Sequence, residues 1–165
     1  MTADQIGRRA ETYAQIALSM PAEAKGGRVL FQTTPLGDKY PTLDLLVDLI
    51  DDQDEAVGYF FVQVKGTTKP RPPGGRLPVE VELLHYNRMV RHPSPTYLIG
   101  VDLCDLRQPA AYLIAASAER AAMLSSMSRT FDLAEDAVRI ALYDEVVRYW
   151  AAVGRPPHHS RFCDD

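Results

Sequence analysis

The sequence predicts a single α/β domain in which helices pack against a mixed central sheet. Apolar residues recur at three- and four-residue intervals near both ends of the chain, which is the helical period. Aromatic and β-branched runs bounded by Gly and Pro occupy the middle and are typical of strands. The resulting order is helix, strands with a hairpin, helix, two strands and helices. An α/β/α sandwich is the simplest architecture that accommodates this order.

The length and composition indicate one domain. With 165 residues and 46% hydrophobic content, the chain is long enough for one core and short for two. We expect a core over residues 5–116, helices over residues 117–153 and a flexible tail over residues 155–165. The domain as a whole then covers residues 1–154.

The charge and the cysteines restrict the partners and the compartment. A net charge of -4 argues against a protein that coats DNA or an anionic membrane, so any nucleic-acid contact must be local. Cys104 and Cys163 have neither disulfide density nor metal-ligand spacing, which suits a reducing compartment. No signal pattern and no apolar run of about 20 residues is visible. We therefore expect a cytoplasmic protein without a membrane partner.

The N-terminal half begins with a helix and continues into a hairpin. Apolar residues from Ile6 to Met20 follow a helical stripe that ends before Pro21. Residues 28–32 are a short strand candidate, and a loop is expected over residues 33–41. Two further strand candidates flank an acidic turn and predict a long antiparallel hairpin. These hairpin strands cover residues 43–50 and 59–68.

The C-terminal half alternates between helices and strands. A Pro- and Gly-rich loop over residues 69–76 precedes a helix over residues 79–91. Asp132, with Glu135 three residues later, predicts the N-cap of a long final helix that ends near Gly154. The other expected elements are strands over residues 97–103 and 111–116 and a short Ala- and Met-rich helix over residues 117–128.

Two polar residues interrupt the apolar run of the central strand. Gln63 and Lys65 lie two positions apart and therefore point to the same face of the strand. Burying an amide and an ammonium is unfavourable unless they are paired. Either the side chains reach solvent at the sheet edge, as most strand lysines do, or they line a polar cleft.

The hairpin brings a carboxylate to the same place. A turn centred between Gln53 and Asp54 sets Gln63 opposite Asp44, and a slip of one residue would undo this pairing. Asp48 would lie four residues further along, about 13 Å at ~3.3 Å per residue, too far to share an ion with Gln63. Asp44 is therefore the preferred partner.

These groups suit divalent-metal chemistry. The Asp44 carboxylate, the Gln63 amide oxygen and the Val64 backbone carbonyl form the all-oxygen environment that holds Mg²⁺ or Mn²⁺ with several waters. Lys65 would orient the attacking water and neutralise charge on a phosphoryl oxygen. No Gly-x-Ser-x-Gly elbow and no Gly-Lys-Ser/Thr loop supports serine hydrolysis or nucleotide binding instead.

The motif resembles a known superfamily. A helix with a Glu, an Asp in a hairpin and then Phe-Phe-Val-Gln-Val-Lys-Gly-Thr look like the PD-(D/E)XK, or restriction-endonuclease-like, nucleases. The phrase is closest to a branch of uncharacterised bacterial proteins that carry Gln-Val-Lys-Ser/Thr, and Mrr-type restriction enzymes also have Gln in that slot. The likeness extends over residues 11–116.

The resemblance implies metal-dependent cleavage of DNA, or less readily of RNA. By motif position it assigns Asp44 and Gln63 to the metal, Lys65 to catalysis and Glu11 to a supporting metal role. Two departures remain. Thr42 and Leu43 replace the usual Gly-Ile/Val pair, which leaves Asp38 as a competitor. The neutral Gln63 should also weaken Mg²⁺ binding.

A local excess of basic residues predicts where nucleic acid binds. From Lys65 to Arg91 there are six basic and two acidic residues, although this excess also fits a solvated loop and a helix face. The predicted contacts are Lys69, Arg71, Arg76 and Thr67. Cutting of two strands would favour a homodimer. The sequence leaves open an activating protein partner, and also a non-catalytic nucleic-acid-binding or assembly subunit on the same scaffold.

Overall fold

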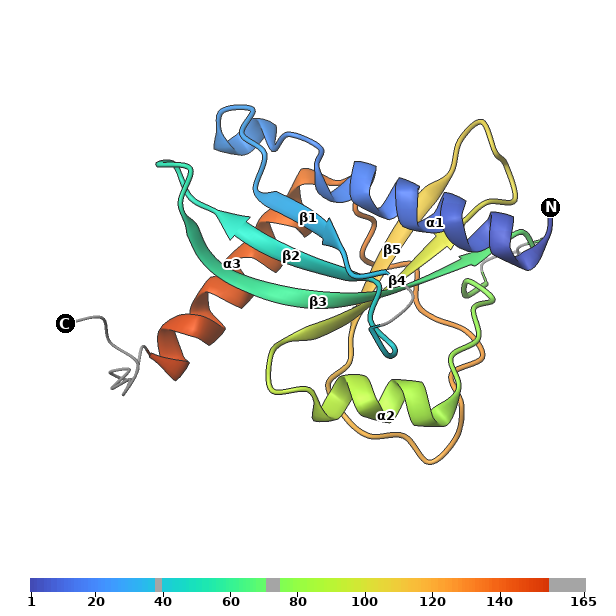
Figure 1. The fold of residues 1–165 in the computed structure, drawn as a ribbon. Coiled ribbons are helices and arrows are strands. Elements are labelled where there is room, and N and C mark those ends of the chain that lie inside the picture. The colour runs from blue at the N-terminus through green and yellow to red at the C-terminus, as the bar shows by residue number, and fades with distance from the viewer. Residues whose placement is uncertain (38–39, 71–74, 155–165) are drawn as a thin grey trace.

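A computed structural model describes residues 1–37, 40–70 and 75–154 (Figure 1). Its five strands lie in one sheet in chain order. The central pair is parallel and the other pairs are antiparallel, so the sheet is mixed. This confirms the predicted α/β class. The strands are β1 (Phe31–Pro35), β2 (Leu45–Ile50), β3 (Ala56–Thr67), β4 (Thr96–Asp102) and β5 (Ala110–Ala115).

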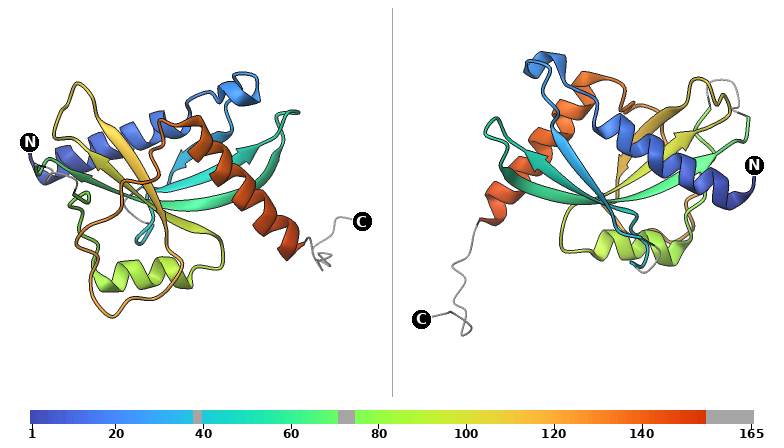
Figure 2. Two further views of the ribbon diagram at one scale, coloured as in Figure 1. Left: turned by 180° about the vertical axis from the view of Figure 1, so that it is seen from behind. Right: turned by 45° about the horizontal axis from the view of Figure 1, so that its top comes forward.

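Helices lie on both faces of the sheet (Figure 2). The helices are α1 (Ala3–Leu18), α2 (Leu83–Arg91) and α3 (Asp136–Val153), with a short 3₁₀ helix η1 (Glu23–Lys25) after the first. The first and third share one hydrophobic cluster with the sheet, whereas the second belongs to a cluster on the opposite face. Among the described residues, no helix combines the length and apolarity needed to cross a membrane.

The N-terminal helix forms where the sequence predicts it. Thr2 and Gln5 make a reciprocal capping box at its start. Ala10, Ala14 and Ala17 are buried against the sheet, and the small side chains let the helix approach closely. The helix ends three residues before Pro21, which cannot continue it.

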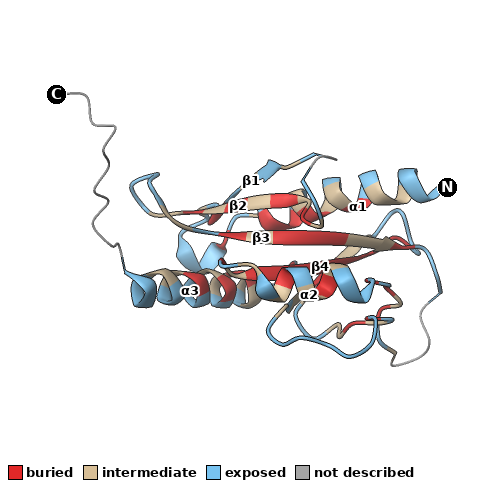
Figure 3. Ribbon diagram, turned by 60° about the horizontal axis from the view of Figure 1, so that its bottom comes forward, coloured by how far each residue is buried: buried red, intermediate tan, exposed pale blue. Residues whose placement is uncertain are grey.

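The core is densest at the middle of the sheet. All seven residues of β4 are buried, and Figure 3 shows the buried part of β3 beside it. Along β3, Phe60, Val62 and Val64 face the cluster shared with α1 and α3. The alternate residues face the α2 side because side chains alternate along a strand.

Two boundaries differ from the sequence expectation. The first strand begins at Phe31 and continues to Pro35, into the expected loop, because it pairs with β2 along its length. Helix α2 begins at Leu83 rather than at position 79, because the preceding residues are extended and pair with a distant segment.

The predicted helix over residues 117–128 is wrong. Leu124 pairs with Val81 and Met127 pairs with Leu77 through backbone hydrogen bonds in both directions. Both Leu124 and Met127 are buried. Gly100 on β4 lacks the side chain that would clash with Met127, so the segment packs directly on the sheet. Tertiary packing therefore overrides the helix propensity of Ala and Met.

The last helix also starts later than predicted. Its N-cap is Glu135. Asp132 instead forms an antiparallel β-bridge with Tyr112 of β5, and its side chain accepts the Ala134 N–H at 2.9 Å. The segment before the helix is extended along β5. There the Leu133 N–H donates to the Ala111 carbonyl at 2.8 Å, and the Leu133 side chain is buried. The chain thus covers the edge of β5 before turning into the helix.

Candidate functional site

The hairpin has the register that the sequence predicts. Leu45 lies opposite Val62 and Leu46 lies opposite Phe61. The Asp44 N–H continues this ladder by donating to the Val62 carbonyl at 2.8 Å. Asp44 is therefore the residue next to Gln63 on the neighbouring strand, and both side chains belong to the α2 face of the sheet.

The Asp44 carboxylate lies over the backbone of the central strand. Its Oδ2 accepts the Val64 N–H at 2.6 Å, and the side chain is half-buried. Burial raises the pKa of Asp44, and the Val64 N–H and the Lys65 ammonium offset only part of this effect. The carboxylate is thus held in a place where its charge is incompletely compensated.

Gln63 has an unused acceptor. The residue is 4% exposed, and among the described residues no donor reaches its buried Oε1. Leaving a buried acceptor unpaired costs about 1–3 kcal/mol. The Val64 carbonyl points to the same side as the Val64 N–H, beyond the start of β2 at Leu45. The Asp44 carboxylate, the Gln63 amide and the Val64 carbonyl thus belong to adjacent positions at this end of the strand.

Lys65 lines a polar cleft of about 510 Å³ on the α2 face. The cleft is lined by Lys65, Glu80, Val81, Glu82, His85 and Met123. Glu80 also pairs with Lys69 at 2.9 Å, and both side chains are exposed. The Lys65 charge acts on the neighbouring Asp44, so with Glu80 and Glu82 this region holds more carboxylates than its lysines neutralise.

His85, which lines the cleft, and Thr42, which contacts His85, were not assigned to the site from the sequence. His85 Nδ1 lies 2.8 Å from Thr42 Oγ1, and its Nε2 lies 3.9 Å from Glu82. Thr42 has φ 78°, a left-handed conformation that is strained for a β-branched residue. Thr42 lies two residues before Asp44, and a β-branched residue gives no local sequence signal for a left-handed conformation.

The other predicted metal ligands lie apart from the cleft. Asp48 pairs with Tyr59, four residues from Asp44 along β2, as the register requires. Glu11 is half-buried on α1, on the other face of the sheet, and is not among the residues that line the cleft. Asp38, the competitor of Asp44, lies outside the described residues.

The predicted nucleic-acid contacts are spread over several places. Thr67 is buried, and its Oγ1 accepts the Lys69 N–H at 3.2 Å. Arg76 is exposed and donates from Nε to Ser126 Oγ at 3.0 Å. Arg71 lies outside the described residues.

The donor set fits a hard divalent cation with few protein ligands. Within the residues that the structure describes, no group of three or more His, Cys, Asp or Glu is arranged to hold a metal. The predicted site needs only one carboxylate, because an amide oxygen and a backbone carbonyl supply the rest. Mg²⁺ is commonly bound in this way, with waters completing its octahedron.

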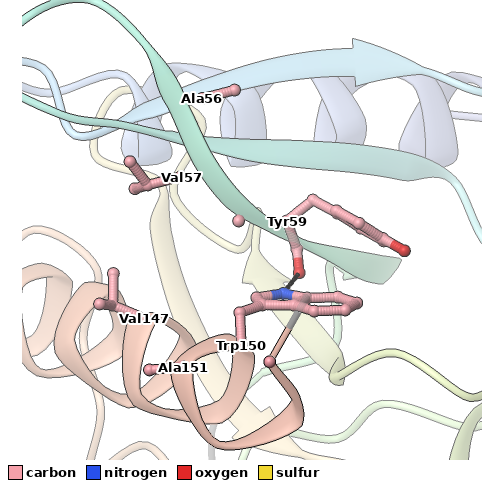
Figure 4. Close-up of a pocket in the computed structure, with 8 residues that line it drawn as sticks. Ala56, Val57, Tyr59, Val147, Trp150 and Ala151 are labelled. Carbon is pink, nitrogen blue, oxygen red and sulfur yellow. Dashed lines mark hydrogen bonds between the residues drawn. The ribbon is translucent and has the colours of Figure 1, made fainter. Parts of the chain in front are cut away.

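A second hollow, of about 440 Å³, lies at the hairpin end of the same strand (Figure 4). It is lined by Ala56, Val57, Gly58, Tyr59, Val147, Trp150, Ala151 and Gly154. The Trp150 indole N–H donates to the Tyr59 carbonyl at 2.7 Å. This hollow is apolar and has no titratable group apart from the Tyr59 phenol.

Comparisons with models of protein families, with curated proteins and with solved structures find no match. The site must therefore be interpreted from its own chemistry.

Proposed function

We propose that this chain is a metal-dependent nuclease of the restriction-endonuclease-like type that hydrolyses phosphodiester bonds, in DNA rather than RNA. Defence against foreign DNA or DNA repair would use such an activity. The main support is the meeting of Asp44 with Gln63 and Lys65 on one face of the sheet, in the register expected from the sequence.

The residues that would hold Mg²⁺ or Mn²⁺ are Asp44, Gln63 and the Val64 carbonyl, without Glu11, which lies on α1 across the sheet. Two observations favour this set. The Gln63 oxygen is buried without a partner among the described residues, and burial raises the pKa of Asp44. A bound cation would satisfy both groups. It would also supply Lewis-acid polarisation of the scissile phosphate and acidify a bound water.

The charge of the cleft explains why a metal would be required. Glu80 and Glu82 line the cleft together with Lys65, and Asp44 interacts with the same ammonium, so the site without a cation would repel a phosphodiester. A divalent cation at Asp44 would reverse this balance. The same carboxylates would then discourage binding of nucleic acid in the wrong register.

Lys65 has the position of the catalytic cation. Its side chain lines the cleft, shares a face of β3 with Gln63 and interacts electrostatically with Asp44. From there its ammonium can donate to an attacking water and to a phosphoryl oxygen, which stabilises the charge that develops in the transition state. Asp44 can accept a proton from that water only through its second oxygen, because its Oδ2 is occupied by the Val64 N–H.

The test is cleavage of supercoiled plasmid and labelled oligonucleotides with Mg²⁺ or Mn²⁺. Wild-type protein should cut them, and Lys65→Ala should abolish cutting while the melting temperature stays within a few degrees. Lys25→Ala, at an exposed position on η1, is the matched control and should cut normally. Equal cleavage by wild type and Lys65→Ala would remove the catalytic assignment.

A non-catalytic nucleic-acid-binding or assembly subunit is the second candidate. The neutral Gln63 favours it, because a single carboxylate binds Mg²⁺ more weakly than a pair does. Such a subunit would bind nucleic acid, would not cut it with any divalent metal, and would show the same affinity after Lys65→Ala.

A further inference from the structure

Two distant segments form a short antiparallel arm on the α2 face of the sheet. Residues 77–81 pair with residues 124–127 through bridges at Leu77–Met127 and Val81–Leu124. One end of this arm borders the cleft of Lys65. The other end borders a separate hollow of about 330 Å³, lined by Gly75, Arg76, Ser128, Arg129 and Thr130.

The lining of this 330 Å³ hollow is cationic. Among the described residues, it contains two guanidinium groups and two hydroxyls and no carboxylate. Among the described residues, no carboxylate forms a salt bridge with Arg76 or Arg129. Uncompensated arginines beside hydroxyl groups are the side chains that bind phosphate oxygens.

Both guanidinium groups are held in place by neutral partners. Arg76 donates from Nε to Ser126 Oγ at 3.0 Å and from Nη2 to the Ser126 carbonyl at 3.1 Å. The Arg129 guanidinium lies over the Tyr112 ring, 5.3 Å from its centre. Its buried Nε has no acceptor among the described residues. The two forks are thus preorganised without losing their charge, which lowers the entropic cost of binding an anion.

The sheet sets this hollow in line with Lys65. Lys65 pairs with Gly100, and Gly100 pairs with Tyr112, so the three residues form one row across β3, β4 and β5. Strand spacing of about 4.8 Å separates the backbones of Lys65 and Tyr112 by about 10 Å. At a rise of about 3.4 Å per nucleotide along one strand, this distance corresponds to about three nucleotides.

We propose that Arg76 and Arg129 form a phosphate-binding site that holds the backbone of the nucleic acid a few nucleotides away from the bond at Lys65. The ligand class is a phosphodiester, and its identity as the nuclease's own substrate rests on the proposed function. The hollow is much larger than one phosphate group needs, which favours a polymer over a free ion. It would position the substrate without reading its bases.

The experiment measures binding of a short fluorescent DNA duplex, by anisotropy over a series of salt concentrations. Ca²⁺ replaces Mg²⁺ in the buffer, so that a cation can neutralise the cleft while cleavage is suppressed. Each lost phosphate contact lowers the slope of log affinity against log salt by about 0.9. Arg76→Gln and Arg129→Gln should each show a loss of this size and several-fold weaker binding. Arg148→Gln, an exposed arginine on α3 across the sheet, should leave both values unchanged.

Further arms separate this inference from the proposed hydrolysis. Lys65→Ala should lose cleavage and keep the contribution of Arg76 and Arg129 to the slope. If no divalent metal supports cleavage but the arginine variants still lower the slope, hydrolysis fails and this site stands. Unchanged slopes in both arginine variants would overturn the site, as would wild-type protein that does not bind DNA at low salt.

Two controls cover the remaining outcomes. Arg129→Lys keeps the positive charge and loses the two-pronged guanidinium, so it should retain the salt slope. This control separates loss of charge from any disturbance of the packing on Tyr112 in Arg129→Gln. Inorganic phosphate provides the other arm and should compete with DNA only weakly. If phosphate binding depends on Arg76 and Arg129 but DNA binding does not, the hollow takes a free ion and the nucleic-acid assignment is wrong.

Discussion

The two ends of β3 are built in opposite ways. At the hairpin end, a Cβ added to Gly58 would lie 2.6 Å from Trp150 Cδ1, so the ring packs flat on the strand. The Tyr59 carbonyl is satisfied there by the indole N–H. At the other end, Gln63 keeps an acceptor for which the described residues offer no donor, and burial raises the pKa of the neighbouring Asp44.

One end of β3 is therefore built for packing, and the other end carries the features of a functional site. The hairpin end satisfies its polar groups and gains stability from an aromatic contact. The other end combines an unpaired acceptor, an incompletely compensated carboxylate and a strained Thr42. Such local violations cluster at functional sites and are tolerated where the rest of the structure is stable. The predictions below test each end separately.

The largest effect should come from Trp150→Ala. Removing the ring should lower the free energy of unfolding by about 2–4 kcal/mol, because the packing on Gly58 and the bond to Tyr59 are both lost. Denaturant unfolding measures this change. Val153→Ala, at an exposed position on the same helix, should change stability by less than about 0.5 kcal/mol. A loss of metal response in folded Trp150→Ala protein would contradict the separation of the two ends.

Gln63→Leu should act in the opposite direction on stability. Replacing the unpaired amide by an apolar group of similar size should raise the free energy of unfolding by about 1–2 kcal/mol in chelator. The same variant should lose stabilisation by Mn²⁺. Gln32→Leu, at an exposed position of β1, should show no such gain. A destabilised Gln63→Leu protein would show that the amide is paired in solution.

These two predictions depend on features that differ in how well the sequence reveals them. The hairpin register was predictable, because a turn centred between Gln53 and Asp54 sets Leu45 opposite Val62 and Leu46 opposite Phe61. Asp44 beside Gln63 follows from that register alone. The unpaired Gln63 acceptor does not follow from the register, because it depends on whether neighbouring residues offer a hydrogen-bond donor.

The hollow of Arg76 and Arg129 and the contact of His85 with Thr42 could not be predicted. The hollow depends on residues 77–81 pairing with residues 124–127, and an Ala- and Met-rich sequence gives no local signal for that pairing. The Thr42–His85 contact joins residues that are 43 positions apart. A helix over residues 117–128 was the better local prediction. It fails because Gly100 leaves room on the sheet for Met127, a tertiary feature.

Thr42→Gly should have a smaller effect. Glycine relieves the left-handed strain, which is worth about 1–2 kcal/mol, but it removes the contact with His85 and adds freedom to the unfolded chain. The net change in unfolding free energy should be within about 1 kcal/mol of zero. Thr34→Gly, at an exposed position of β1, lacks the relief and should be more destabilising. An equal loss in both variants would show that Thr42 is not strained.

The smallest effect should be the pH dependence of metal binding. Because burial raises the pKa of Asp44 in the folded state, its protonation favours folding. This contribution is present below the unfolded pKa of about 3.9 and is lost as pH rises through the folded pKa. Metal binding needs the ionised form, so stabilisation by Mn²⁺ should weaken already in mildly acidic buffer. Thermal melts across pH measure this, and a flat response down to the usual aspartate pKa would contradict it.

The central claim is that Asp44 and its neighbours bind a divalent cation. It is tested most directly by the Mn²⁺-induced rise in melting temperature of wild type, Asp44→Asn and Asp48→Asn, since a ligand that binds only the folded state must stabilise it. We predict a rise for wild type and Asp48→Asn, and none for Asp44→Asn. No rise in wild type, or an equal rise in Asp44→Asn, would contradict the account.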